Sequence, residues 1–153
     1  MCLFTHLGEA RTASKDITCY KIVYPGDSQE TPSDVFKSLM MKFHYKIGVT
    51  YEEPEFNVTS EEPDFEIDDK KGRVVHKGFH SYRKLSEAAY WVSGRHAILK
   101  CVIPAGSKYY YDPNKNYYCS NKLKIVAWRQ PFMKPRAWSM EQRTNADAQG
   151  HIV

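Results

Sequence analysis

The chain has 153 residues, the usual length of a single domain, and a formal net charge of +4 at pH 7. No run approaches the roughly 20 apolar residues that span a bilayer, and residues 1–16 lack the apolar stretch of a signal peptide. The sequence therefore predicts one cytoplasmic domain over residues 1–153 with no membrane partner, in which residues 130–153 form a carboxyl-terminal extension.

The first part of the chain predicts two strands, a short helix and an acidic loop. Residues 17–24 are β-branched and aromatic and end at Pro25 and Gly26, which is typical of a strand followed by a turn. Ser33 is placed to cap a helix over residues 34–41, because the apolar residues of that segment fall on one helical face. The sequence then predicts a strand at residues 43–47 and a loop or edge ribbon at residues 51–69.

The second part predicts a helix between strands. A turn at residues 68–72 is expected to lead into a strand at residues 73–76. The next helix is expected to begin at Ser81 or Ser86 and to end at Gly94 in a left-handed carboxyl cap. Three more strands are predicted at residues 97–103, 108–111 and 122–128, with a turn at residues 112–114.

These elements predict an α+β fold with a small mixed, mainly antiparallel sheet and one or two short helices. The extension carries Phe132, Met133 and Trp138 in an otherwise polar stretch. We expect something to hold this tail, and a second copy of the chain is the candidate, which would make the protein a homo-oligomer.

The four cysteines, Cys2, Cys19, Cys101 and Cys119, are too far apart in the sequence for a paired metal or redox motif. We expect reduced thiols, with Cys19 and Cys101 acting as small buried residues inside strands. The histidines show no metal-ligand spacing, and the usual glycine-rich phosphate loops, zinc motifs and serine-nucleophile motifs are absent from the sequence. We therefore expect no metal and no cofactor.

Charge is divided between two parts of the chain. All charged residues between Tyr51 and Asp69 are acidic, whereas lysine and arginine dominate from Ala89 to Ser139, where Asp112 is the one acid. The two regions either pair with each other or present a positive face to an anionic ligand, and the alternative is that both are simply solvated. General nucleic-acid binding is disfavoured, because the acidic region would repel a phosphate backbone.

The densest group of functional side chains is the run from Gly78 to Arg83, predicted as a glycine-led turn between a strand and a helix. Turns at helix amino termini present N–H groups and side chains to anions. The run therefore supplies candidate ligand-binding residues for a phosphate or ribose: Phe79, His80, Ser81, Tyr82 and Arg83. The alternative for His80 is a purely structural role.

A second group combines a cation with aromatic rings, a combination suited to stacking a base. It consists of Lys108, Tyr109, Tyr110 and Tyr111, with two more tyrosines at positions 117 and 118. Alternation along a strand places Tyr109 and Tyr111 on one face and Lys108 and Tyr110 on the other. Only half of the run can line one pocket, and Lys108, Tyr109 and Tyr111 are the candidate ligand-binding residues.

The pattern as a whole resembles a group of short uncharacterised proteins from bacteria and their phages. The shared features are the MCL start, the Cys19-Tyr20-Lys21 strand, the GFHSY run at residues 78–82 and the KCVIPAGSKYY run at residues 100–110. The resemblance extends to Trp128. It implies a single domain, and it implies no particular activity.

A weaker similarity is to the ADP-ribosyltransferase fold. Tyr20 and Lys21 look like the aromatic-basic pair of its first strand, and Phe79-His80-Ser81 looks like its serine motif. The glutamate that supports transfer in that family has no counterpart between residues 88 and 140. The similarity therefore implies a nucleotide-shaped cleft that includes Tyr20 and Lys21, rather than transferase chemistry.

The leading hypothesis is a non-enzymatic protein that binds a small anionic nucleotide, phosphorylated or ADP-ribose-like, in a basic pocket lined by tyrosines. Such a protein would serve as a phage or bacterial sponge of a nucleotide immune signal, with no catalytic residue. One alternative is an ADP-ribosyltransferase-like or nucleotide-cleaving enzyme with His80 as general acid or base, since the ordinary imidazole pKa lies near neutrality. Another is an inhibitor that binds a host protein through residues 51–69 or the aromatic tail.

Overall fold

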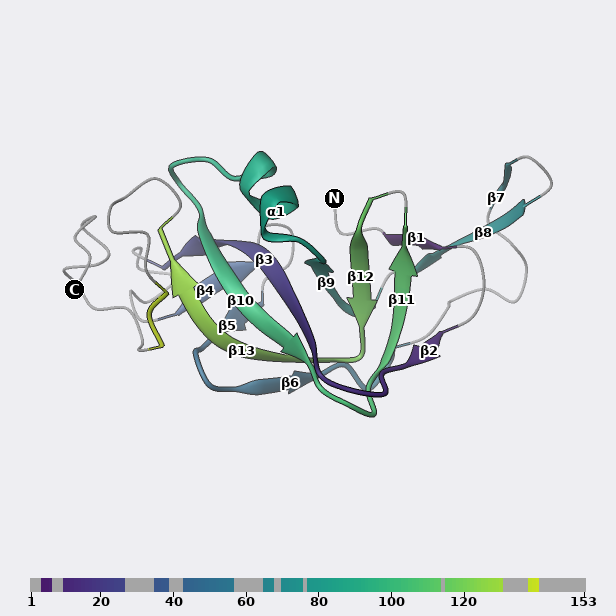
Figure 1. The fold of residues 1–153 in the computed structure, drawn as a ribbon, viewed down its shortest axis with the longest axis horizontal. Helices are drawn as coiled ribbons and strands as arrows, with labels where there is room; N and C mark the ends of the chain where they lie inside the picture. The colour runs from purple at the N-terminus through teal and green to yellow at the C-terminus, as the bar shows by residue number, and fades with distance from the viewer. Residues whose placement is uncertain are drawn as a thin grey trace.

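The structure is a computed structural model that describes residues 4–6, 10–26, 35–38, 43–56, 65–67, 70–75, 77–113, 115–130 and 138–140. These residues form a ten-stranded antiparallel sheet, a three-stranded sheet and one short helix (Figure 1). The predicted α+β class is confirmed in outline, although strands dominate. The part of the chain that is described contains no helix long and apolar enough to span a membrane.

The large sheet follows the order β2 (Arg11–Thr12), β11 (Lys108–Asp112), β12 (Tyr117–Ser120), β9 (Phe79–Tyr82), β3 (Ile17–Pro25), β10 (Ala97–Ile103), β13 (Lys122–Arg129), β6 (Thr50–Glu52). Two short strands are added beside the end of β3: β4 (Phe36–Ser38) pairs with β3, and β5 (His44–Tyr45) pairs with β4. The small sheet has the order β1 (Phe4–His6), β8 (Lys70–Val75), β7 (Phe65–Ile67).

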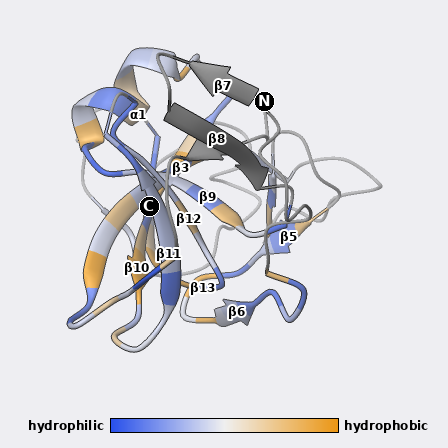
Figure 2. Ribbon diagram, turned by 90° about the vertical axis from the view of Figure 1, so that its right-hand side faces the viewer, coloured by the Kyte–Doolittle hydropathy of each residue, from blue (hydrophilic) through white to orange (hydrophobic). Residues whose placement is uncertain are grey.

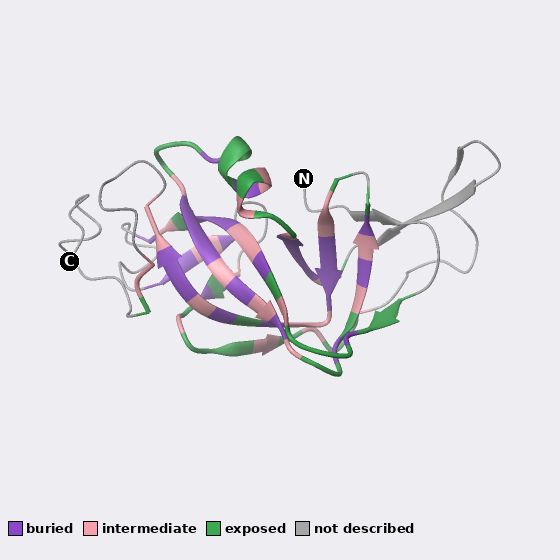
Figure 3. Ribbon diagram, viewed as in Figure 1, coloured by how far each residue is buried: buried purple, intermediate pink, exposed green. Residues whose placement is uncertain are grey.

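Alternation along the strands sorts the side chains of the large sheet onto two faces, which we call the inner and the outer face. Cys19 and Cys101, which pair across β3 and β10, are fully buried in the main core on the inner face. On the outer face, Ile98 packs with Ala88 of helix α1 (Leu85–Trp91). Figure 2 shows hydrophobic segments within these strands, and Figure 3 shows buried and part-exposed residues alternating along β10 and β13. The predicted burial of the two thiols is confirmed.

The predicted strands at residues 17–24, 97–103, 108–111 and 122–128 are confirmed as β3, β10, β11 and β13. The expected edge ribbon includes β6, which borders β13. The strand expected at residues 73–76 begins earlier, at Lys70, as β8. Each of these segments contains β-branched or aromatic residues, which favour strands.

The helix predicted over residues 34–41 is wrong for residues 36–38, which form β4. Phe36 is fully buried, and its ring centroid lies 5.4 Å from that of Trp128. Pairing with β3 satisfies the backbone of this segment, whereas a short isolated helix would be marginal. Residues 34 and 39–41 lie outside the described residues, as do Cys2 and residues 131–137 and 141–153 of the extension.

The turn predicted over residues 78–83 is also wrong, because residues 79–82 form β9. This strand pairs with β12 along its whole length and with β3 on its other edge. Helix α1 begins only at Leu85, and it ends before Val92, so Gly94 lies beyond its end and does not cap it. The side chains of the run are therefore divided between the two faces of a sheet.

The end of the described chain is held by the sheet itself. The Trp128 N–H donates a hydrogen bond of 2.9 Å to the Ser139 carbonyl, and the Ser139 N–H donates one of 2.8 Å to the Trp128 carbonyl. The Trp138 ring lies on the outer face, 6.0 Å from the ring of Tyr20. The homo-oligomer expected from the tail stays a prediction.

Candidate functional site

A row of tyrosines crosses the inner face at the β2 end of the large sheet. In register, Tyr111 of β11 lies opposite Tyr118 of β12, and Tyr118 lies opposite Ser81 of β9. The ring centroids of Tyr109 and Tyr111 lie 5.8 Å and 5.2 Å from that of Tyr118. Tyr118 is almost completely buried, whereas Tyr109 and Tyr111 are half-buried and offer ring surface to solvent.

Arg83 follows directly after β9 and is fixed to this row by a ring of hydrogen bonds. Its backbone N–H donates to the Asn116 carbonyl at 2.8 Å, and its Nη1 donates to the Tyr111 hydroxyl at 3.0 Å. The Tyr111 hydroxyl in turn donates to Asn116 Oδ1 at 2.9 Å. Asn116 has a left-handed backbone (φ 49°), a conformation that asparagine tolerates better than most residues. The tight turn before β12 thus positions both Arg83 and Tyr111.

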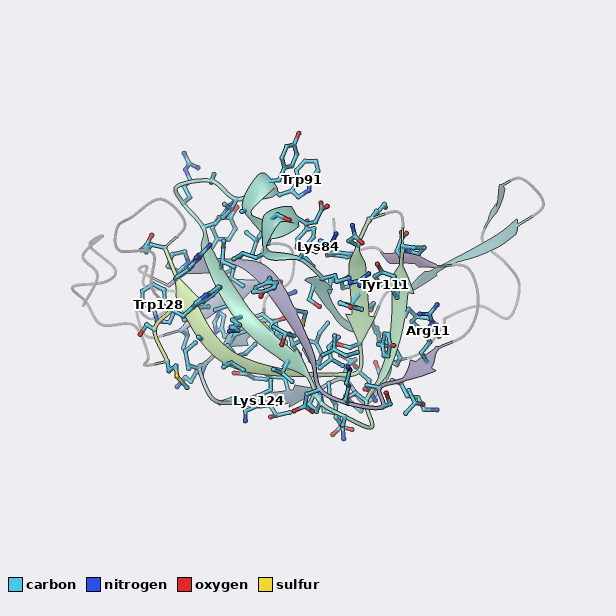
Figure 4. All side chains as sticks on the ribbon, viewed as in Figure 1. Arg11, Lys84, Trp91, Tyr111, Lys124 and Trp128 are labelled. Carbon is cyan, nitrogen blue, oxygen red and sulfur yellow. The ribbon has the colours of Figure 1, made fainter. Side chains whose placement is uncertain are left out.

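Arg11 reaches the same tyrosine from the other side of β11. It lies opposite Tyr109 in the pairing of β2 with β11. Its guanidinium carbon is 6.0 Å from the centroid of the Tyr111 ring, and that of Arg83 is 5.7 Å from it. Figure 4 shows Arg11 and Tyr111 at the same end of the sheet. We call Arg11, Arg83 and Tyr111 the Arg–Tyr cluster.

The electrostatics of the cluster favour an anion. Both arginines are exposed, and neither forms an ion pair with a carboxylate among the residues that the structure describes. The hydrogen bond with Tyr111 raises the pKa of Arg83, and burial raises the pKa of Tyr118. A guanidinium is always charged in proteins, so the two arginines bring two positive charges to the cluster. A guanidinium has five N–H donors, so the contact with Tyr111 leaves most of those of Arg83 available.

His80 lies away from this cluster, on the outer face, and is buried. Its Nε2 is 3.8 Å from the Sγ of Cys119, its register partner in β12, and its ring centroid is 5.7 Å from that of Tyr117. Burial, with a smaller contribution from the charge of Lys21, lowers the pKa of His80 to about 3. The imidazole is neutral at physiological pH and is a weak base, which fits packing better than proton transfer.

The structure thus divides the residues expected at the site. Ser81, Arg83, Tyr109 and Tyr111 share the inner face with the cluster, and Ser81 is buried there with no hydrogen-bond partner for its hydroxyl in the described part of the chain. Phe79 and Lys21 share that face deeper in the core, where the Lys21 ammonium donates to the His80 carbonyl at 2.7 Å. The remaining members lie on the outer face: Tyr20, His80, Tyr82 and Lys108.

Arg11 was not singled out by the sequence. Its strand has two residues and no hydrophobic pattern, so only its pairing with β11 reveals its position. The described residues contain no group of three histidine, cysteine or acidic side chains suited to a metal ion. Comparison of the chain with protein-family models, with curated proteins and with solved structures gives no match. The chemistry of the site must therefore be judged from its own geometry.

Proposed function

We propose that the protein binds a phosphorylated or ADP-ribose-like nucleotide at the Arg–Tyr cluster and releases it unchanged. The observation that carries this proposal is the meeting of two exposed guanidinium groups on one tyrosine ring, with their carbons 5.7 Å and 6.0 Å from its centroid. Like charges that form no ion pair with a carboxylate in the described part of the chain repel each other, and a bound anion relieves that repulsion. Guanidinium groups match phosphate oxygens in a planar, bidentate geometry.

The tyrosines beside the cations favour a nucleotide over a simple inorganic anion. Tyr109 and Tyr111 are half-buried, and both pack against Tyr118, so their rings are held in place before any ligand arrives. Ordered aromatic rings stack on bases, and their hydroxyl groups bond to ribose or phosphate. A site that is already ordered loses less conformational entropy when the ligand binds.

The same groups support binding without chemistry. An arginine guanidinium stays protonated in proteins, so neither arginine of the cluster can serve as a general base. His80, the candidate general acid or base, lies on the opposite face with a pKa of about 3. Binding without turnover lowers the free concentration of a ligand, which is what a sponge for a nucleotide signal requires.

The test is titration calorimetry with ADP-ribose, cyclic ADP-ribose isomers and cyclic dinucleotides. We expect heat from at least one of them, and we expect Arg11→Ala and Arg83→Ala each to weaken that binding about tenfold or more, because each removes a charge-assisted hydrogen bond. Lys115→Ala, at an exposed position outside the cluster, is the matched control for the lost charge.

Two results would contradict the proposal. Absence of heat from every nucleotide would rule out the ligand class. Recovery of a cleaved or transferred product, after heat denaturation of a stoichiometric complex and chromatography of the supernatant, would favour the enzymatic alternative instead.

A further inference from the structure

A line of four cations crosses the outer face of β13 and β10, far from the Arg–Tyr cluster in the sheet order. Lys122 and Lys124 alternate with buried residues of β13, so they share this face. Lys124 lies opposite Val102 of β10, and Lys100 is two residues before Val102 on the same face. Arg129 lies opposite Ile98, two residues further along. We call Lys122, Lys124, Lys100 and Arg129 the cation track.

Lys100 lies on the strand beside the other three cations, and the register shifts between Lys100 and Cys101. Along the strand direction the cations follow one another at two-residue steps, about 6.8 Å per step in an antiparallel sheet. This repeat is close to the separation of successive phosphates in an extended nucleic-acid strand. An extended peptide offers the same repeat of negative charge only if every second residue is acidic, whereas a nucleic acid carries a phosphate at every step.

The surroundings of the track favour a polyanion. Lys124 is exposed, and Lys100 and Lys122 are partly exposed. Among the described residues Glu52, opposite Lys122 at the β6 edge, is the one carboxylate in register with this face of β13. The prediction from the sequence disfavoured nucleic-acid binding because it considered the acidic region and the basic region together. In the fold, four cations of the basic region are gathered on one face.

Two aromatic rings border the end of the track that carries Lys100 and Arg129. The Arg129 guanidinium carbon lies 4.9 Å from the centroid of the Trp138 ring, and the Lys100 ammonium nitrogen lies 5.9 Å from it. The centroid of the Tyr20 ring lies 6.0 Å from that of Trp138. These cation–π contacts orient the two cations, and both rings are only partly buried. A base that follows its phosphate along the track would meet ring surface here, as in other sheets that bind single strands.

We propose that the outer face of β10 and β13 binds single-stranded nucleic acid along the cation track. The site is separate from the Arg–Tyr cluster and does not depend on the proposed nucleotide binding. Phosphate contacts supply its affinity, and little sequence preference is expected, because the register places cations on this face rather than side chains arranged to read bases.

The experiment is fluorescence anisotropy with a fluorescein-labelled twelve-nucleotide oligothymidine, titrated with the full-length protein at several salt concentrations. We expect saturable binding that weakens with salt. Lys100→Ala combined with Lys124→Ala should weaken it about tenfold or more and should lower the slope of log K against log salt by about 1.4, since each phosphate contact to a single strand contributes about 0.7.

The control removes the same charge elsewhere. Lys46→Ala combined with Lys115→Ala changes two exposed lysines that lie outside the track. We expect this double variant to bind the oligonucleotide as the parent does. An equal loss in the control would mean that net charge alone causes binding, and it would overturn the proposal. Absence of binding at low salt would also overturn it, as would binding of polyglutamate without binding of the oligonucleotide, which would point to an acidic protein partner.

Discussion

Gly78 is the residue at which the pairing of β9 with β12 can be tested most directly. It has a φ of +153°, and a Cβ added to it would lie 2.5 Å from the Sγ of Cys119 and 3.0 Å from the Phe56 ring. Cys119 is completely buried in β12, so moving its sulfur aside would disturb the packing around it. Gly78→Ala should therefore strain both the backbone and the packing.

The expected cost follows from these two contributions. An L-residue at this φ costs about 1–3 kcal/mol, and overpacking of a closed core costs about 1–3 kcal/mol. We expect Gly78→Ala to lower the free energy of unfolding by about 2–6 kcal/mol. Urea denaturation followed by circular dichroism measures this change.

A second variant separates the two contributions. In a Cys119→Ala background, which lacks the sulfur, the same glycine substitution should lose the part of its cost that comes from the contact with Cys119. It should keep the backbone part and the close contact with the Phe56 ring. A change within about 0.5 kcal/mol for Gly78→Ala alone, the range of an ordinary surface substitution, would refute the placement of β9 against β12. It would also remove the basis for placing Ser81 and Arg83 beside the tyrosine row.

Three other changes test neighbouring parts of the structure. Tyr111→Phe removes a hydroxyl that forms hydrogen bonds with both Arg83 and Asn116. We expect thermal denaturation to show a free energy of unfolding lower by about 0.5–1.5 kcal/mol. An unchanged melting temperature would contradict the ring of hydrogen bonds. Trp138→Ala removes the ring that contacts Tyr20, Lys100 and Arg129. We expect urea denaturation to show a free energy of unfolding lower by about 1–2 kcal/mol. An unchanged free energy would mean that Trp138 does not pack on the sheet in solution. Because the pKa of His80 falls from 6.5 to about 3 on folding, its contribution to stability is complete above pH 6.5 and is lost as the pH falls from 6.5 toward 3. In that window it contributes a slope of about 1.4 kcal/mol per pH unit, and His80→Gln should flatten the measured profile by that amount.

The long regular strands could be predicted from the sequence because their signal is local. Residues 97–103 are mostly buried, and residues 122–125 alternate between buried and more exposed positions, and the apolar pattern of each segment is visible in the sequence alone. The short strands β4 and β9 could not be predicted, because their pairing depends on partners distant in the sequence. Phe79, for example, lies opposite Ser120, and Pro25 lies opposite Phe36.

The contrast between local pattern and long-range pairing also explains which site residues could not be predicted from the sequence. A turn presents all its side chains to one ligand, and residues 79–83 were expected to act together for that reason. A strand instead sends alternate side chains to opposite faces, so Ser81 shares a face with the tyrosine row while His80 and Tyr82 do not. Arg83 and Tyr111 belonged to separate groups in the sequence, and the structure brings their side chains into contact. Arg11 had no local signal, since its position depends on register alone.

The two proposed sites lie on opposite faces of one sheet, and this arrangement predicts that they act independently. Between them are the central strands β9 and β3, and β3 contributes the fully buried Cys19 to the core. A packed core of this kind transmits little change unless it has two alternative packings. Arg83→Ala should therefore leave oligonucleotide binding unchanged, and Lys100→Ala with Lys124→Ala should leave nucleotide binding unchanged. Calorimetry and anisotropy on the same set of variants measure both effects. If Arg83→Ala weakens both ligands equally, a single anionic surface binds them both, and the division of the fold into two binding faces is wrong.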